Sequence, residues 1–207
     1  MVTITYRNAN INLDEQVYDP AEDSYLLADV AIDNAKKGMK VLEVGAGTGF
    51  VSAVLQENVD VDLIATEISP IAATCARSSG VEVIRADMFN CFKPGPMFDL
   101  ILFNPPYLPT SEDEKVPGWL NYAFDGGADG RDSVNRFIDE VPGHLTRNGI
   151  VLILISSLTG IEQVKERMEA CGFEVDTCGS DNCFFEELIV VKGTFLAQKL
   201  DPAKTRS

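Results

Sequence analysis

The sequence has little histidine, and none of its five cysteines forms a CxxC pair. Zinc sites and histidine-based catalytic triads need these residue types at close spacing, so we expect no metal site and no triad. An odd, scattered set of cysteines is typical of reduced, mostly buried thiols. The single histidine, His144, stands in VPGHLTRNG, where we expect a helix end whose free carbonyls it can meet.

Long apolar runs are also missing. No stretch approaches the roughly 20 apolar residues that cross a bilayer. The longest run, GIVLILISSL at 149–158, has the composition of a buried strand. The N-terminus lacks a basic region followed by an apolar block, so we expect no signal peptide, no membrane association and a cytoplasmic protein.

Positive charge is scarce, because 17 Lys and Arg stand against 32 Asp and Glu, for a formal net charge of −15. Such a chain repels phosphate backbones, so we expect no tight binding of nucleic acid by the chain alone. The charge is compatible with a basic protein partner, and equally with no role beyond solubility.

The 207 residues, 45% of them hydrophobic, are enough for one globular domain. We place this domain at residues 1–195 and a polar C-terminal tail at 196–207.

Seven segments have the composition of strands, and segments with helical spacing separate most of them. The predicted strands are 39–45, 61–67, 80–87, 98–104, 149–156, 173–178 and 187–193, and the predicted helices are 50–59, 69–79, 132–145 and 160–172. This alternation predicts an α/β fold with a doubly wound, mostly parallel seven-stranded sheet. The last two strands lie too close together for a crossover helix, so we expect the last strand to be antiparallel, which favours a methyltransferase over a dehydrogenase.

The first predicted strand leads through Glu43 into a glycine-rich loop, GAGTG at 45–49. Glycines let the backbone turn tightly and approach a ligand closely. The spacing GxGxG differs from the dinucleotide fingerprint GxGxxG, whose last glycine would fall at Phe50. The spacing of this loop, which begins with Gly45, therefore argues against an NAD-dependent oxidoreductase without excluding one.

Acidic residues end the next two predicted strands, at the edge of the sheet where α/β proteins bind ligands. Glu67 lies where an acid commonly bonds ribose hydroxyls, and Asp87 is suited to an exocyclic amine. Met88 offers an apolar surface for an aromatic base. A single acid at a strand end is more often a cap or a solvated turn, but together with the glycine loop these residues predict a pocket for an adenosine-containing cofactor.

The fourth predicted strand ends in Asn104-Pro105-Pro106-Tyr107, a stiff turn of unusual composition. A planar amide or adenine nitrogen is a poor nucleophile, because its lone pair is delocalised. Two fixed acceptors for its N–H groups would turn the lone pair toward an incoming methyl group. We expect the Asn104 side-chain oxygen and the Pro105 carbonyl to be these acceptors, with Tyr107 stacked on the planar group.

Four stretches together resemble the HemK-like class I methyltransferases, which have a Rossmann-like fold. They are VYDPAEDSYLL (17–27), LEVGAGTG (42–49), NPPYLP (104–109) and FDGGADGRD (124–132). The resemblance implies S-adenosylmethionine-dependent N5-methylation of the glutamine in the GGQ motif of class 1 peptide release factors. The NPPY stretch alone is shared with enzymes that methylate amino groups in DNA or RNA.

The resemblance also implies residue roles. Its implied cofactor contacts are Ser24, Glu43, Gly45, Glu67, Asp87, Met88 and Asn104, and its implied glutamine site is Asn104, Pro105, Pro106 and Tyr107. Many relatives have aspartate in place of Glu67, whose longer side chain should still reach a ribose. Some relatives have glutamate in place of Asp19, a difference to which we assign no meaning.

Only 41 residues precede the LEVGAGTG stretch, which makes the chain similar to the short archaeal and eukaryotic branch of the family. Members of that branch need a small zinc-binding activator protein, which adds a strand beside the third strand of the sheet. In this chain the segment 80–87 would be that edge, unless a loop of the chain itself covers it. We also expect the loop 111–132 to close over the substrate, with mobile glycines and with Arg131 free to clamp an acid.

Three other readings stay open at this point. The first is methylation of an adenine or another amino group in DNA or RNA, which fits the NPPY stretch but not the net charge. The second is a nicotinamide-dependent oxidoreductase. The third is a scaffold that binds the cofactor without using it.

Overall fold

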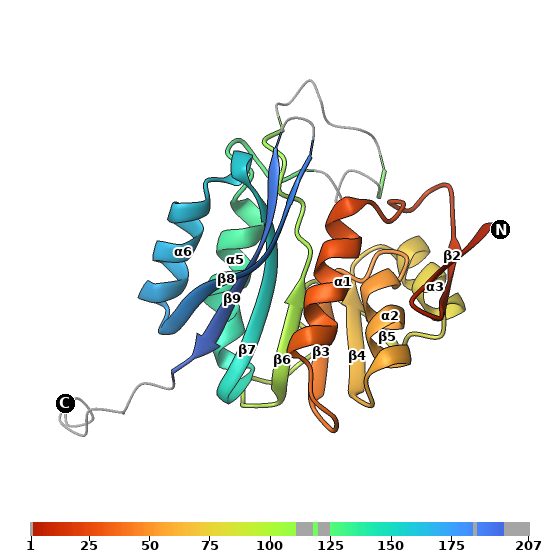
Figure 1. The fold of residues 1–207 in the computed structure, drawn as a ribbon, viewed down its shortest axis with the longest axis horizontal. Helices are drawn as coiled ribbons and strands as arrows, with labels where there is room; N and C mark the ends of the chain where they lie inside the picture. The colour runs from red at the N-terminus through yellow and green to blue at the C-terminus, as the bar shows by residue number, and fades with distance from the viewer. Residues whose placement is uncertain (1, 111–117, 120–124, 184–185, 197–207) are drawn as a thin grey trace.

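The computed structural model describes residues 2–110, 118–119, 125–183 and 186–196 (Figure 1). Its main sheet has the order β5-β4-β3-β6-β7-β9-β8. These strands are β3 (Lys40–Val44), β4 (Asp62–Glu67), β5 (Val83–Arg85), β6 (Phe98–Phe103), β7 (Leu145–Ser156), β8 (Phe173–Asn182) and β9 (Glu187–Phe195). Neighbours from β5 to β7 are parallel, and β9 runs antiparallel to β7 and β8. The predicted fold and its antiparallel last strand are confirmed.

The order of the strands creates a switch point between β3 and β6. The chain runs outward from β3 through β4 to β5, and then returns to the other side of β3 as β6. The last residues of the two central strands, Val44 and Phe103, are paired. The glycine loop and the Asn104 turn therefore leave the sheet side by side, in the crevice where open α/β sheets bind ligands.

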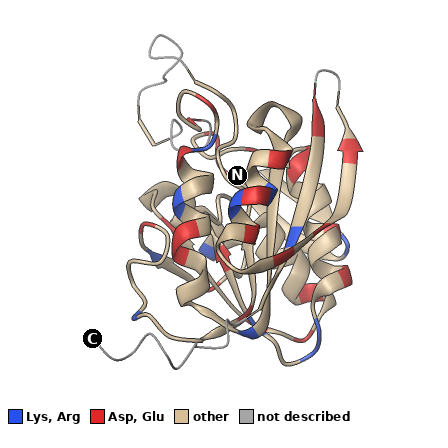
Figure 2. Cartoon of the chain, turned by 90° about the vertical axis from the view of Figure 1, so that its left-hand side faces the viewer, with Lys and Arg blue, Asp and Glu red and all other residues tan. Residues whose placement is uncertain are grey.

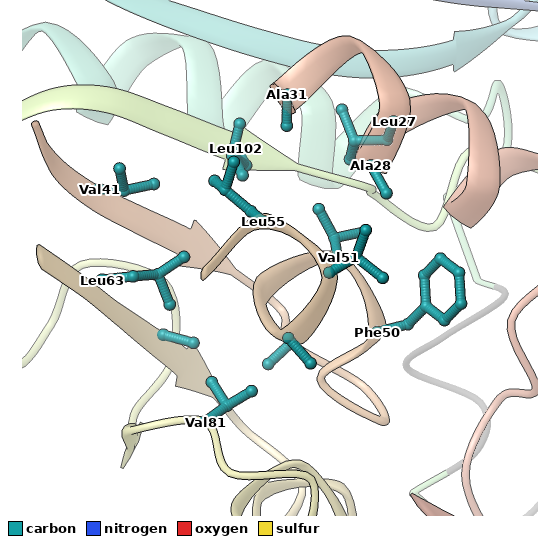
Figure 3. Close-up of a cluster of buried hydrophobic side chains, with 14 of the residues drawn as sticks. Leu27, Ala28, Ala31, Val41, Phe50, Val51, Leu55, Leu63, Val81 and Leu102 are labelled. Carbon is teal, nitrogen blue, oxygen red and sulfur yellow. The ribbon is translucent and has the colours of Figure 1, made fainter. Parts of the chain in front are cut away.

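Helices cover both faces of this sheet. They are α1 (Glu22–Asn34), α2 (Phe50–Asn58), α3 (Pro70–Ser78), α5 (Asp132–Glu140) and α6 (Ile161–Ala170). Successive strand residues point to opposite faces, so Leu102 packs with α1 and α2 while Ile101 packs with α5 and α6. Figure 3 shows the first of these layers, where Val51 of α2 lies beside Ala28 of α1 and Leu55 lies toward Leu102 of β6.

An N-terminal hairpin, which the sequence analysis did not predict, precedes the main sheet. It consists of β1 (Val2–Tyr6) and β2 (Ala9–Leu13) and lies beside α2 and α3 (Figure 1). Its two-residue turn, Arg7-Asn8, has both φ angles positive, at 42° and 70°. Turns of this kind match the twist of paired strands, and asparagine tolerates the conformation well. The hairpin buries Ile11 completely.

Two boundaries differ from the prediction. The helix expected at 132–145 ends at Glu140 and continues only as a short 3-10 turn at Val141–Gly143, because Pro142 supplies no backbone N–H. The strand expected at 80–87 is reduced to the three residues of β5. Beyond the domain, the predicted tail lies outside the described residues except for Leu196.

The cysteines are free thiols, as expected, but the prediction that most are buried is wrong. Only Cys75 is buried, whereas Cys91 is exposed and the other three are partly exposed. His144 follows the 3-10 turn, as expected for a helix end, and stacks on Phe89 at 4.6 Å between ring centroids. Within the described ranges, no helix is both long and apolar enough to span a bilayer.

Candidate active site

A cavity of about 680 Å³ lies beyond the carboxyl ends of β3, β4, β5 and β6. Every residue predicted for the site lines it: Ser24, Glu43, Gly45, Glu67, Asp87, Met88, Asn104, Pro105, Pro106 and Tyr107. The structure thus brings together residues from five separate stretches of the chain. The volume of the cavity is in the range of cofactor and small-ligand sites.

The glycine loop forms the floor of the cavity beside β3. Gly45, Gly47 and Gly49 have φ angles of 72°, 56° and 79°, a backbone region that other residues rarely adopt. At Gly49 there is also no room for a side chain, because an added Cβ would lie 3.0 Å from atoms of Ala76 and Val81. The loop can therefore turn sharply and present bare backbone to a ligand.

Glu67 joins this loop to the start of α3. Its carboxylate accepts hydrogen bonds from the Gly47 N–H at 2.9 Å and the Ser69 N–H at 2.8 Å. The side chain is only 8% exposed, and this burial raises the pKa of the carboxyl group. A carboxylate can accept about four hydrogen bonds, and Glu67 lines the cavity, so the group can still accept from ribose hydroxyls.

Glu43 is buried more deeply, at 2% exposure. It accepts a hydrogen bond from the Ser52 N–H at 3.0 Å and a second, short one from the Ser52 hydroxyl. Burial, with a smaller contribution from the charge of Glu67, raises the pKa of Glu43 to about 8. The Glu43 side chain is therefore largely neutral at pH 7, unlike an ordinary surface glutamate.

Asp87 has a partner that the sequence analysis missed. Arg136 of α5 donates through Nη1 to both carboxylate oxygens, at 2.9 and 2.8 Å, and through Nε to Glu140 at 2.9 Å. The oxygens of Asp87 keep further lone pairs for an exocyclic amine, but their positions are set by the arginine. A lone arginine in a helix carries no sequence signal for this role.

Asn104 is oriented by a buried acid. Its Nδ2 donates to Asp23 Oδ2 at 3.1 Å, and its Oδ1 is buried with no hydrogen-bond partner in the described part of the chain. A buried acceptor without a partner costs free energy, so the chain holds this oxygen ready for a donor that enters the cavity.

Asp23 is the second residue that sequence reasoning missed. It lies in the first turn of α1, is 3% exposed and also accepts from the Tyr18 hydroxyl at 3.2 Å and the Ser24 hydroxyl at 3.0 Å. The Asp23 carboxylate only accepts hydrogen bonds. The Asn104 amide therefore turns its NH₂ group toward Asp23 and its oxygen away from it. The DPAEDS stretch contained this signal, but from the sequence we expected a helix N-terminus, whose dipole favours acids, together with a wall of the cofactor site, and gave Asp23 no role toward Asn104.

The backbone carbonyl groups in and just after the Asn104–Tyr107 turn, called the acceptor turn below, differ in whether they accept a hydrogen bond. The carbonyls of Pro106, Tyr107 and Leu108 all accept hydrogen bonds within the chain. The Pro105 carbonyl accepts none from the described residues. Among the residues that the structure describes, neither of the two acceptors that the sequence analysis assigned to a substrate amide has a partner. Burial and the nearby Asp23 raise the pKa of Tyr107, so its hydroxyl stays neutral.

The charge of the cavity is negative. Carboxyl groups line it on several sides, and among the described lining residues Arg136 alone is cationic and is already paired with acids. Such a site attracts a cation and disfavours the diphosphate of a dinucleotide. Together with Met88, the acids and the glycine floor fit an adenosine cofactor that bears a positive sulfur.

Part of the loop at 111–132 is outside the described residues, namely 111–117 and 120–124. In the described part, Arg131 is already engaged within the chain, because it donates to the Thr159 carbonyl at 2.6 Å and to Asp129 at 2.6 Å. It is therefore not the free side chain that we expected to bind an acid. Gly130 faces the acceptor turn, and an added Cβ there would lie 2.4 Å from the Tyr107 oxygen. Close packing and the positive φ angle of 72° both require glycine at this position.

Comparisons with known proteins agree with this geometry. Residues 19–117 match a family model described as "Methyltransferase small domain". The chain is 40% identical to a "Putative protein N5-glutamine methyltransferase" of Methanocaldococcus jannaschii, over 91% of this chain and 96% of the relative. It is 32% identical to the human "Methyltransferase HEMK2", over 86% of this chain and 89% of that protein.

Among solved structures, the chain resembles the Encephalitozoon cuniculi Mtq2–Trm112 complex, described as methylating the eRF1 translation termination factor. The TM-score is 0.72 with 24% identity, over 87% of this chain and 99% of the matched one. At this identity the likeness supports the fold.

Proposed function

Because the chain belongs to the HemK-like protein glutamine methyltransferases, we propose that it transfers a methyl group to the N5 atom of the glutamine in the GGQ motif of a class 1 peptide release factor. The chain is an S-adenosylmethionine-dependent enzyme. One observation carries the substrate assignment: on one rigid turn, the buried Asn104 Oδ1 and the Pro105 carbonyl are two acceptors that no described residue contacts by a hydrogen bond.

A primary amide has two N–H donors on a planar nitrogen, which matches two such acceptors. When both N–H groups are held, the nitrogen lone pair is directed away from the turn and into the cavity. A charged lysine side chain would bring three donors and a positive charge into a site where Asp23 already has its partners. The turn therefore favours a neutral planar amino group over a charged amine, and the likeness to a protein N5-glutamine methyltransferase favours an amide over adenine.

Asn104 and Pro105 provide positioning and electrostatic stabilisation without acting as bases. S-adenosylmethionine supplies a methyl group activated by its positive sulfur. As the new N–C bond forms, the bond between the methyl group and sulfur would break, and the cofactor would leave as neutral S-adenosylhomocysteine. The amide nitrogen then carries the positive charge, and its held N–H groups become acidic. The two oxygens stabilise this charge, and one proton then leaves to water. The neutral Tyr107 ring can pack against the planar amide.

The cofactor would lie across the glycine floor. We assign Glu67 to the ribose hydroxyls, Asp87 to the exocyclic amine and Met88 to the face of the base. We assign Ser24, Glu43 and Gly45 to the neighbouring wall. Every one of these residues lines the same cavity, which supports the assignment.

Mass spectrometry of a release-factor domain tests this function directly. The domain would be incubated with the enzyme and S-adenosylmethionine, with duplex DNA as a competing acceptor. We expect the mass of one methyl group on the GGQ glutamine, and none of it with the Asn104→Ala variant. Methylation of DNA alone would replace this assignment by the amino-methylation of nucleic acid.

We also propose a second, small zinc-binding subunit that pairs with β5. The support is structural: β5 is the edge strand, paired with β4 on one side. Arg77 donates to the Val83 carbonyl at this edge, but the other outward backbone groups of β5 have no hydrogen bond from the described residues and can accept another strand. The chain's fold is also that of a protein solved as a complex.

Tagged enzyme purified from its native cells would test the pairing, with metal analysis of any co-purified subunit. The N–H groups of β5 alternate in direction: Glu82 and Ala86 pair with β4, so the N–H of Val83 points to the free edge. A proline at Val83 removes this outward N–H and should weaken the association. A complex that is unchanged by Val83→Pro would place the partner elsewhere.

A further inference from the structure

The glycine-rich stretch 125–132 takes no part in the chemistry proposed above, yet it lies against the back of the acceptor turn. Asp125 forms an isolated parallel bridge with Leu108. The Gly126 N–H donates to the Leu108 carbonyl at 3.1 Å, and the Thr110 N–H donates to the Gly127 carbonyl at 2.9 Å. The two segments therefore behave as one short paired unit.

The contact is so close that it excludes side chains. A Cβ added to Gly126 would lie 2.8 Å from the Leu108 oxygen and 2.9 Å from the Pro106 oxygen. At Gly130 it would lie 2.4 Å from the Tyr107 oxygen. Contacts under about 3 Å with carbonyl oxygens cannot be relieved by a side-chain rotation, so a larger residue would displace the turn.

Two hydroxyl groups hold the carbonyls on this side of the turn. Ser133, in the first turn of α5, donates to the Pro106 oxygen at 3.1 Å. Thr159 is fully buried and donates to the Tyr107 oxygen at 3.3 Å. Its Oγ1 also accepts from the Ser156 N–H at the end of β7, so this hydroxyl is tied to the sheet.

We propose that Ser133 and Thr159 are positioning residues for methyl transfer, which fix the direction of the Pro105 carbonyl through its neighbours. The reason is geometric. The ring of Pro106 fixes its φ angle, and peptide groups are planar. A Pro106 carbonyl held by Ser133 therefore leaves the preceding peptide, which contains the Pro105 oxygen, little freedom to rotate.

This inference rests on the proposed function, and steady-state kinetics on the GGQ glutamine test it. Ser133→Ala and Thr159→Val should each lower kcat about tenfold or more, because small misplacements of reacting groups cost this much. The KM for the protein and the affinity for S-adenosylhomocysteine, measured by calorimetry, should change less than threefold. Ser133→Thr and Thr159→Ser keep the hydroxyl and should restore most of kcat.

Thr74→Val is the matched control, because the Thr74 hydroxyl also donates to a carbonyl, that of Pro70 at 2.8 Å, but on the exposed side of α3. It should leave kcat unchanged. If the wild-type enzyme does not methylate glutamine, the proposed function fails. If it does and both hydroxyl deletions keep the wild-type kcat, the positioning role is wrong. Should Thr159→Val not fold, Ser133→Ala and its threonine rescue decide alone.

A pair of glycine variants gives an independent measurement. Gly130 and Gly38 have similar φ angles, 72° and 81°, so alanine strains the backbone alike at both. A Cβ at Gly38 meets nothing within 4 Å, whereas at Gly130 it meets the turn. We expect Gly130→Ala to lower kcat about a hundredfold with cofactor affinity retained, and Gly38→Ala to keep kcat. Equal kcat in both variants would contradict the inference.

Discussion

At the scale of single residues, the site depends on which atom of an amide faces the substrate. Asparagine carries a donor and an acceptor of nearly equal shape, so its position alone does not determine its chemistry. Here Asp23 removes the ambiguity, because it can only accept. The substrate-facing oxygen of Asn104 is thus a property of two residues that stand 81 positions apart.

We predict that Asp23→Asn lowers kcat by roughly 10- to 100-fold, because an amide at position 23 can satisfy Asn104 in either orientation. The affinity for S-adenosylhomocysteine should change little. Kinetics and calorimetry on the purified variant measure the two effects. Asp29→Asn is the control on the same helix, since Asp29 pairs with Arg7 at the surface. A wild-type kcat in Asp23→Asn would show that other contacts orient Asn104.

A second prediction at this scale concerns Glu43 and pH. Its pKa is about 8 in the folded chain, against 4.5 for an ordinary glutamate, so the folded state keeps a proton that the unfolded state has lost. The stabilising effect of that proton is complete below the unfolded pKa and disappears as pH rises through 8. The free energy of unfolding of the wild type should therefore fall by up to about 1.4 kcal/mol per pH unit across this window.

The Glu43→Gln variant lacks this titration, so its stability relative to the wild type should increase from pH 5 to pH 9. Urea denaturation at a series of pH values measures the difference. Glu57→Gln, on the exposed side of α2, should follow the wild type throughout. A constant difference between Glu43→Gln and the wild type would mean that Glu43 is ionised at all these pH values.

At the scale of elements, side chains that pack closely on a strand backbone explain a glycine inside regular structure. Gly193 stands in β9 where α6 and β8 cross it, and an added Cβ would lie 2.5 Å from the end of Met168 and 2.9 Å from the Phe173 ring. The sequence shows only a glycine near the end of a strand. Its reason appears when the helix is packed on the sheet.

We predict that Gly193→Ala destabilises the fold by about 1–3 kcal/mol, the usual cost of overpacking a core. The cost should be near the lower limit, because Met168 is flexible and can move. Urea denaturation measures it, with Gly143→Ala as the control, since a Cβ at Gly143 meets nothing within 4 Å. Equal stability of the two variants would show that the core absorbs the extra carbon without strain.

At the scale of the whole molecule, the excess of acid extends from the surface into the cavity. Figure 2 shows Asp and Glu on the helices and toward the ends of strands over one side of the chain. The formal net charge of −15 and the acidic lining act in the same direction. The net charge and the cavity lining both favour binding of a cationic ligand, and both disfavour binding of a dinucleotide with its negative diphosphate.

We therefore predict that S-adenosylmethionine stabilises the protein and that NAD does not. A ligand at 100 times its Kd adds about 2.7 kcal/mol, which for a chain of this length corresponds to roughly 5–10 °C in Tm. Thermal unfolding monitored with each ligand at matched concentration measures this. A shift with NAD as large as that with S-adenosylmethionine would contradict the electrostatic argument.

Strand composition and spacing were enough to predict the α/β fold, because each parallel strand is covered on both faces and appears as a continuous apolar run. The same argument placed the glycine loop, Glu67, Asp87 and the acceptor turn at one edge of the sheet, since parallel strands end on the same side. The β1–β2 hairpin was missed, although its alternation and the Asn8 turn were visible. The end of α5 was also missed, although Pro142 was visible in the sequence, and β5 is shorter than its apolar run predicted.

The sequence by itself determined which chemical groups the site contains, because these groups follow the strands in chain order and the sheet must bring strand ends together. Only the tertiary structure decided which way those groups face. Asp23 orients Asn104, Arg136 holds Asp87, and Ser133 with Thr159 occupies the carbonyls after Pro105. Each of these contacts joins residues distant in the chain through hydrogen bonds that depend on direction, and composition or spacing carries no information about direction.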